Sequence, residues 1–250
     1  MKNKKTNVLM GHIVAGYPTK EMSVQAGFGI CKGGAKYLEV QFPFSDPNAD
    51  GTIIESACVE ALKNGFKIED GFDIIKNLSE NTSSEILIVT YANIVYSYGI
   101  KNFVKRAKQC GAKGIIVPDL PFEEDEGLRK FALEEEIKVI ELIAPGITPE
   151  RIKKLSKTPS DFVYVVARTG ITGKKTHINQ DLFEWIEFVR SNCNKKIALG
   201  FGINSNSQIK ALQGKVDIVV VGSYFVQKIT SHKKNIQSFL QKYATDLLSF

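Results

Sequence analysis

Short apolar segments recur along the chain at intervals that suit strands separated by helices. They are nearly continuous in apolar residues and do not alternate with polar ones, which is typical of strands buried on both faces and therefore of a parallel sheet. Eight such segments are predicted as strands, at 8–16, 36–42, 85–91, 113–120, 138–144, 161–167, 196–202 and 217–223.

The segments between these runs show helical spacing. In IKNFVKRAKQC, the apolar residues Ile100, Phe103, Val104 and Ala107 follow the i, i+3, i+4, i+7 pattern of one helix face. The segment 122–136 carries acidic residues at its start, where the helix dipole favours them, so a helix is predicted to begin there. Further helices are predicted at 53–65, 69–79, 181–190 and 205–214.

Eight strands alternating with helices in 250 residues predict a (β/α)8 TIM barrel, an α/β fold that we expect to form one domain over residues 1–250. A doubly wound sheet is the rival interpretation. It usually has fewer strands, and its best-known dinucleotide signature, GxGxxG after the first strand, is absent here.

Composition narrows the classes of function. Hydrophobic residues make up 43% of the chain and charged residues 24%, as in globular proteins. No apolar run is long enough to cross a bilayer and no secretory pattern follows Met1, so we expect a cytoplasmic protein without a membrane partner. Its four scattered cysteines form no CxxC pair and are interpreted as reduced thiols. The net charge of +6 comes with no basic-aromatic cluster, which argues against nucleic acid and fits an anionic small substrate.

Two carboxylates stand where a barrel keeps its active site, at the carboxyl ends of the strands. Glu39 lies near the end of the second predicted strand between apolar neighbours, so its side chain is expected either inside the barrel or outside, paired beneath a helix. Asp50 precedes a predicted helix and is either a helix cap or a functional group. Pro43 and Pro47 stiffen the loop between them, and two carboxylates held around one ligand can divide acid and base tasks.

Glycines mark three other strand ends, in RTGITG (168–173), GFGI (200–203) and VGS (221–223). Barrels commonly bind phosphate with the loops after the last two strands and a helix N-terminus, so this pattern predicts a phosphate site. Tyr164 on the sixth strand is either a core residue or a catalytic one. No His, Cys and Asp cluster has metal-ligand spacing, so no metal is expected. A Ser-His-Asp arrangement and a strand-end lysine for a Schiff base are missing too.

The motifs PFSDPNADG, YANIVYSYG, VPDLP, RTGITG, GFGI and VVVGS follow one another at the predicted strand ends. From about residue 8 to residue 230 the chain resembles the tryptophan synthase alpha subunit family. That resemblance implies a lyase that cleaves indole-3-glycerol phosphate by a retro-aldol reaction to indole and glyceraldehyde 3-phosphate, in tryptophan biosynthesis. It also implies an alpha2beta2 complex whose beta subunit receives the indole and carries PLP, with no cofactor in this chain.

The resemblance assigns roles to individual residues. The catalytic positions fall on Glu39, Asp50 and Tyr164. The positions that bind the substrate phosphate fall on Gly173, Gly202, Gly222 and Ser223. The indole pocket would include Val89, Tyr91, Ile143 and Phe201. A lid over the site would contain Arg168 and Thr172, and the face toward the partner subunit would contain Asp46, Pro47 and Asn93.

The sequence also departs from the family pattern. Gln41 and Phe42 stand where a small and an aliphatic residue are usual, and His12 replaces a common Phe, so the shape of the pocket is not predicted by the resemblance. Two other functions stay open. One is a sugar-phosphate isomerase or epimerase, which would show a similar glycine pattern. The other is a structural subunit that activates a partner enzyme, although the intact Glu39 and Asp50 argue against that as its sole role.

Overall fold

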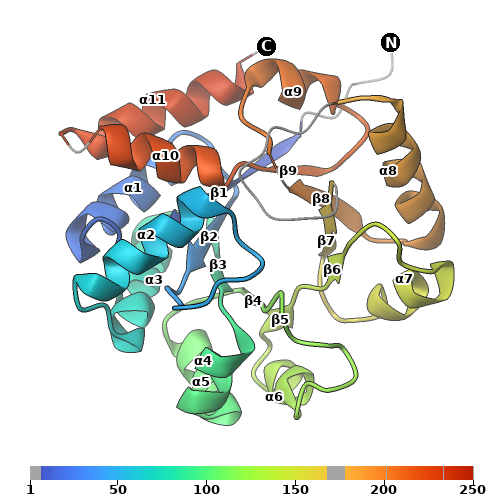
Figure 1. Ribbon diagram of the computed structural model, residues 1–250, viewed down its shortest axis with the longest axis horizontal. Coiled ribbons are helices and arrows are strands. Elements are labelled where there is room, and N and C mark those ends of the chain that lie inside the picture. The colour runs from blue at the N-terminus through green and yellow to red at the C-terminus, as the bar shows by residue number, and fades with distance from the viewer. Residues whose placement is uncertain (1–6, 168–177, 201, 233, 250) are drawn as a thin grey trace.

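The computed structural model describes residues 7–167, 178–200, 202–232 and 234–249, and in this part of the chain a ring of helices surrounds a parallel sheet (Figure 1). The strands are β1 (Val8–Val14), β2 (Tyr37–Gln41), β3 (Glu85–Val89), β4 (Gly114–Ile116), β5 (Lys138–Val139), β6 (Leu142–Ile143), β7 (Phe162–Val166), β8 (Lys196–Gly200) and β9 (Ile218–Val220). The helices are α1 (Lys20–Lys32), α2 (Thr52–Lys63), α3 (Ile68–Asn81), α4 (Ala92–Tyr98), α5 (Ile100–Gln109), α6 (Leu128–Glu134), α7 (Pro149–Leu155), α8 (Gln180–Asn192), α9 (Asn206–Ala211), α10 (Ser223–Ser231) and α11 (Ile236–Leu248).

The strand order closes on itself. Neighbouring strands pair in the order β5-β4-β3-β2-β1-β9-β8-β7-β6, and β5 and β6 at the two ends are consecutive in the chain. Between them, the Ile140 amide donates to the Ile115 carbonyl and the Tyr164 amide donates to the Glu141 carbonyl. The predicted strand at 138–144 is therefore two short strands, each paired with a different neighbour. The short segment between β5 and β6 joins the two ends of the sheet, and the predicted barrel is confirmed.

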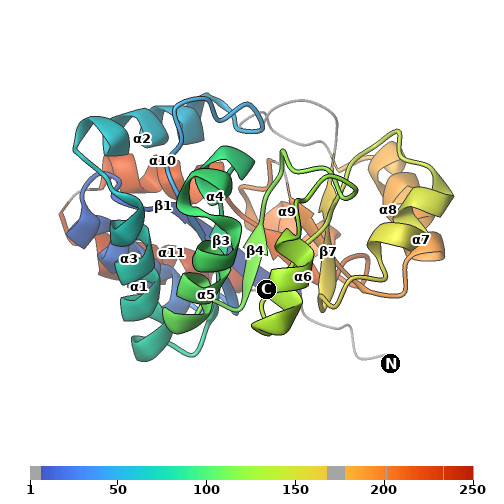
Figure 2. The same cartoon turned by 90° about the horizontal axis from the view of Figure 1, so that it is seen from below.

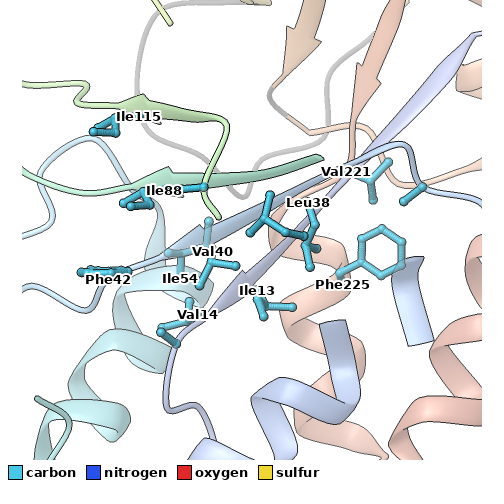
Figure 3. Close-up of a cluster of buried hydrophobic side chains, with 14 of the residues drawn as sticks. Ile13, Val14, Leu38, Val40, Phe42, Ile54, Ile88, Ile115, Val221 and Phe225 are labelled. Atoms are coloured by element: carbon cyan, nitrogen blue, oxygen red, sulfur yellow. The ribbon is translucent and has the colours of Figure 1, made fainter. Parts of the chain in front are cut away.

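Alternate residues of each strand face opposite sides of the barrel wall. Tyr37 of β2 points inward and packs edge-on against Phe162 of β7, with ring centroids 5.3 Å apart. Leu38, Val40 and Phe42 belong instead to the larger apolar cluster under the helices, shown in Figure 3. This alternation decides which residues can reach the barrel interior.

One predicted helix begins later than its sequence pattern suggests. The acidic segment from 122 was expected to form the first turn, but α6 starts at Leu128. Glu126 and Gly127 have φ values of 47° and 92°, which a right-handed helix cannot contain. The Asp125 carboxylate instead accepts hydrogen bonds from the backbone amides of Gly127 and Arg129, so it caps the helix from within the loop.

Seen from the side, the loop after β2 and the start of α2 lie along one edge of the barrel (Figure 2). In parallel strands this edge collects all the carboxyl ends, where TIM-barrel active sites lie.

The four cysteines are free, and three of them are buried. Over the described ranges, no helix is long and apolar enough to cross a membrane.

Candidate active site

A cavity of about 310 Å³ opens at the carboxyl ends of the strands. Its polar lining comes chiefly from β1, β2 and the loop after β2, together with Tyr164 of β7 and the start of α10. Apolar side chains from the other strands complete the wall. The lining includes His12, Glu39, Gln41, Asp50, Ile54, Val89, Ile116, Leu142, Ala144, Tyr164, Val166, Gly202, Val220, Gly222 and Ser223.

Glu39 points into this cavity from the middle of β2 and is only 3% exposed. His12 is its register partner on β1, and the His12 Nδ1 lies 2.9 Å from the Glu39 Oε2. With Glu39 ionised, Nδ1–H donates to the carboxylate; with Glu39 protonated, the carboxyl donates to Nδ1. The pair can thus hold one proton at either atom without losing its hydrogen bond, as a group that shuttles protons requires.

Asp50 reaches the cavity from the loop that joins β2 to α2. Its Oδ2 accepts hydrogen bonds from Gln41 Nε2 at 2.6 Å and from the Tyr91 hydroxyl at 2.9 Å. Tyr91 also accepts from the Ala49 amide at 3.2 Å and stacks on Phe44, so it anchors the loop to the end of β3. Burial raises the pKa of Asp50, and the hydrogen bond from Gln41 is the largest opposing effect.

Tyr164 lies across the cavity on β7. Its burial, followed by the nearby charges of Glu39 and Asp50, raises the pKa of the phenol well above its ordinary value, so the group is a neutral hydroxyl. A Cβ at Gly200 on the neighbouring strand would lie 2.3 Å from the Tyr164 hydroxyl oxygen. Glycine at this position therefore makes room for the phenol.

The end of the cavity beside α10 suits an anion. Gly222 caps this helix without a side-chain hydrogen bond, and Ser223 is its first residue. The first amides of a helix have no acceptor within the helix, so this terminus favours negative charge. Gly202 lines the same cavity with φ of 77°. Gly173, predicted with these positions, lies outside the described residues.

The predicted indole pocket is only partly reproduced. Val89 lines the cavity, whereas Ile143 is fully buried in the cluster that faces the helices and is not part of the cavity lining. Tyr91 is 1% exposed and contacts Asp50 with its hydroxyl instead of lining the cavity. Phe201 lies outside the described residues. Strand alternation could have identified the inward neighbours of Ile143, which are Leu142 and Ala144.

The remaining predicted positions are placed as follows. Asp46 and Asn93 are exposed, whereas Pro47 is buried. Arg168 and Thr172 of the predicted lid lie outside the described residues. Among the residues that the structure describes, no group of three or more His, Cys, Asp or Glu side chains could hold a metal ion.

The two unusual residues of β2 have separate roles. Gln41 points inward, is fully buried and binds Asp50. Phe42 points outward and packs edge-on against the rings of Phe66, Phe72 and Phe103, at centroid distances of 6.1, 5.2 and 6.0 Å. Only Gln41 can alter the pocket, so Phe42 needs no functional explanation.

Known proteins match this chain over nearly its whole length. The family model for the tryptophan synthase alpha chain matches residues 1–248. The tryptophan synthase alpha chain of Helicobacter hepaticus is 53% identical over 94% of this chain and 90% of its own length, and that of Methanococcus vannielii is 38% identical over 90% and 87%. A chain of the tryptophan synthase complex from Pyrococcus furiosus superposes with a TM-score of 0.89 at 32% identity, covering 98% of this chain and 99% of its own. With its barrel, its inward-facing carboxylates and these matches, the chain belongs to the tryptophan synthase alpha chain family.

Proposed function

We propose that this chain cleaves indole-3-glycerol phosphate to indole and glyceraldehyde 3-phosphate, with Glu39 and Asp50 as its two catalytic carboxylates. The observation that carries this assignment is their placement on one cavity with different partners. Glu39 is paired with a base that can share a proton, whereas Asp50 receives only hydrogen-bond donors. Two carboxylates in unlike surroundings can divide the acid and base tasks.

The bond to be broken joins indole C3 to the glycerol chain, and it breaks only when C3 is protonated so that the ring can accept the bonding electrons. Glu39 delivers that proton and later takes one from the glycerol hydroxyl as its carbonyl forms. His12 keeps the carboxyl group oriented in both protonation states, because its Nδ1 can donate or accept.

Protonation at C3 places positive charge on the ring, and the ring N–H becomes more acidic. Asp50, as a carboxylate, accepts this N–H and stabilises the charge as it develops. The apolar wall of Val89, Ile116, Leu142 and Val166 surrounds the indole and excludes water, which strengthens that interaction. Tyr164, neutral and opposite, lies against the substrate as a hydroxyl and not as a phenolate.

The substrate phosphate binds at the N-terminus of α10, through the amides of Gly222 and Ser223 and the Ser223 hydroxyl, with Gly202 beside it. Gly173 would complete this site. Because the phosphate is remote from the bond that breaks, its binding energy fixes the orientation of the reacting end.

We also propose that this chain has the family's lid, partner subunit and partner interface. Arg168 and Thr172 would close over the substrate, and a PLP-dependent beta subunit would receive the indole in a cytoplasmic alpha2beta2 complex. The exposed Asp46 and Asn93 suit a face toward that partner better than the buried Pro47 does. The similar chain from Pyrococcus furiosus comes from a structure of a tryptophan synthase complex, which supports a partner subunit. One domain over residues 1–250 remains our expectation.

Indole release from indole-3-glycerol phosphate by the purified chain, with and without beta subunit, tests this function. Glu39→Gln should lower the rate roughly 100-fold or more, the scale of a lost general acid/base. Glu85→Gln is a matched control, because Glu85 starts β3 at the opposite end of the barrel, in register with Tyr37. Wild-type protein that releases no indole but isomerises sugar phosphates would refute the proposal. Activation of a partner without any cleavage would do the same.

A further inference from the structure

We propose that Gln41 is a positioning residue for Asp50, which holds one carboxylate oxygen so that the other faces the indole N–H. This inference rests on the proposed function, in which Asp50 accepts that N–H. Both donors to Asp50, Gln41 Nε2 at 2.6 Å and the Tyr91 hydroxyl at 2.9 Å, end on Oδ2. Over the described ranges no side chain or backbone amide donates to Oδ1, so that oxygen is left for the substrate.

The donor is itself held in place. Gln41 is the last residue of β2, is 0% exposed, and pairs in register with Val89 of β3. Its Nε2 also lies 3.6 Å from the Cys58 sulfur on α2. A buried side chain at the end of a strand has few other rotamers, so it fixes a loop carboxylate more firmly than the loop alone could.

The amide oxygen of Gln41 indicates a functional role for this residue more than a role in folding. Its Oε1 is buried without a hydrogen-bond partner among the described residues. Turning the amide over would place this oxygen against the Asp50 carboxylate, so the charge on Asp50 fixes which way the amide points. An unpaired buried acceptor costs stability, and such a cost is expected mainly at functional sites.

An amide suits the task because it donates a hydrogen bond without adding charge. Burial alone would favour the protonated acid, which could not accept the ring N–H. Gln41 and Tyr91 counter this by donating hydrogen bonds to the carboxylate, whereas the charge of Glu55 favours the protonated acid. Among the described residues, Glu39 shares the cavity with Asp50, and Cys58, Tyr91 and Tyr164 also lie near it; burial raises the pKa of these last three groups, so they stay neutral.

The test is a double-mutant cycle of Gln41→Met and Asp50→Asn, read as kcat for indole release from indole-3-glycerol phosphate. Methionine matches glutamine in length but has no donor. With Asp50 present, Gln41→Met should lower kcat roughly 10- to 100-fold, the scale of a lost hydrogen bond to a charged group, and move the acid limb of the pH profile to higher pH. With Asp50→Asn already in place, it should cost less than about threefold, and the Kd for glycerol 3-phosphate should stay unchanged in both backgrounds.

A second variant separates positioning from packing. Gln41→Gly removes more atoms but leaves room for water, which can donate to Asp50, so it should keep several times more activity than Gln41→Met. Packing alone predicts the reverse order. Equal losses of kcat from Gln41→Met in both backgrounds, or an unmoved acid limb of the pH profile, would overturn this inference but not the proposed function. If Asp50→Asn left cleavage intact, the catalytic role that the proposed function gives to Asp50 would fail.

Discussion

Phe42 and Gln41 are adjacent in the sequence, yet substitutions at the two positions should change different properties. Phe42→Leu should lower the free energy of unfolding and leave cleavage unaffected. The Phe42 ring is 0% exposed and packs against three other aromatic rings outside the barrel wall. Figure 3 shows Phe42 at one side of the buried apolar cluster. It contributes nothing to the cavity lining.

The magnitude follows from these contacts. Each aromatic pair contributes about 0.5–1.5 kcal/mol beyond area burial, and leucine keeps much of the apolar volume. Phe42→Leu should therefore cost about 1–3 kcal/mol, and Phe42→Ala about 3–5 kcal/mol because it leaves a cavity. At about 2–4 °C per kcal/mol for a chain near this size, Phe42→Leu should lower Tm by several degrees.

Urea unfolding followed by circular dichroism measures the first quantity, and indole release well below Tm measures the second. Phe188→Leu makes the same chemical change on α8, where the ring is 38% exposed, and should alter stability by less than about 0.5 kcal/mol. If Phe42→Leu raised KM severalfold while leaving stability unchanged, the assignment of Phe42 to the core would be wrong.

Two further predictions concern charge. Because Asp50 must be ionised and burial raises its pKa, activity should fall as the pH drops through that raised value. Tyr91→Phe removes a hydrogen-bond donor to the ionised form, so the acid limb of its kcat/KM profile should lie at higher pH than that of wild type. An unmoved acid limb would count against this hydrogen bond. Arg129 donates to both carboxylate oxygens of the buried Glu141 at 2.8 Å, so Arg129→Met should lower the free energy of unfolding, measured in urea, by about 3 kcal/mol. Lys108→Met removes one partner of an exposed ion pair and should leave Tm unchanged. Equal effects of the two substitutions would contradict the role of burial.

Much of the fold could be predicted from the sequence because parallel strands buried on both faces leave a strong apolar pattern. The break within 138–144 could not, since it depends on which neighbour each half pairs with. The late start of α6 could not be predicted from the sequence either. The acidic residues favoured a helix, but the positive φ at Glu126 and Gly127 ended that possibility.

The candidate site was also only partly predictable from the sequence. The positions of Glu39 and Asp50 followed from strand ends and motif spacing. Their partners did not, because the contact of His12 with Glu39 depends on register between strands, and that of Gln41 with Asp50 depends on how a loop folds back. The orientation of Ile143 was not predicted either, because a resemblance identifies a segment, while strand alternation decides which of its residues face inward.

The most direct test of the catalytic assignment is to measure single-turnover cleavage and ligand affinity on the same Asp50→Asn protein. Asparagine keeps the shape of the side chain but removes the charge that the ring N–H requires. We predict that indole formation from indole-3-glycerol phosphate falls roughly 100-fold or more, while the Kd for glycerol 3-phosphate, which has no indole ring, stays within about twofold of wild type. Cleavage by Asp50→Asn at the wild-type rate would contradict the catalytic role of this carboxylate.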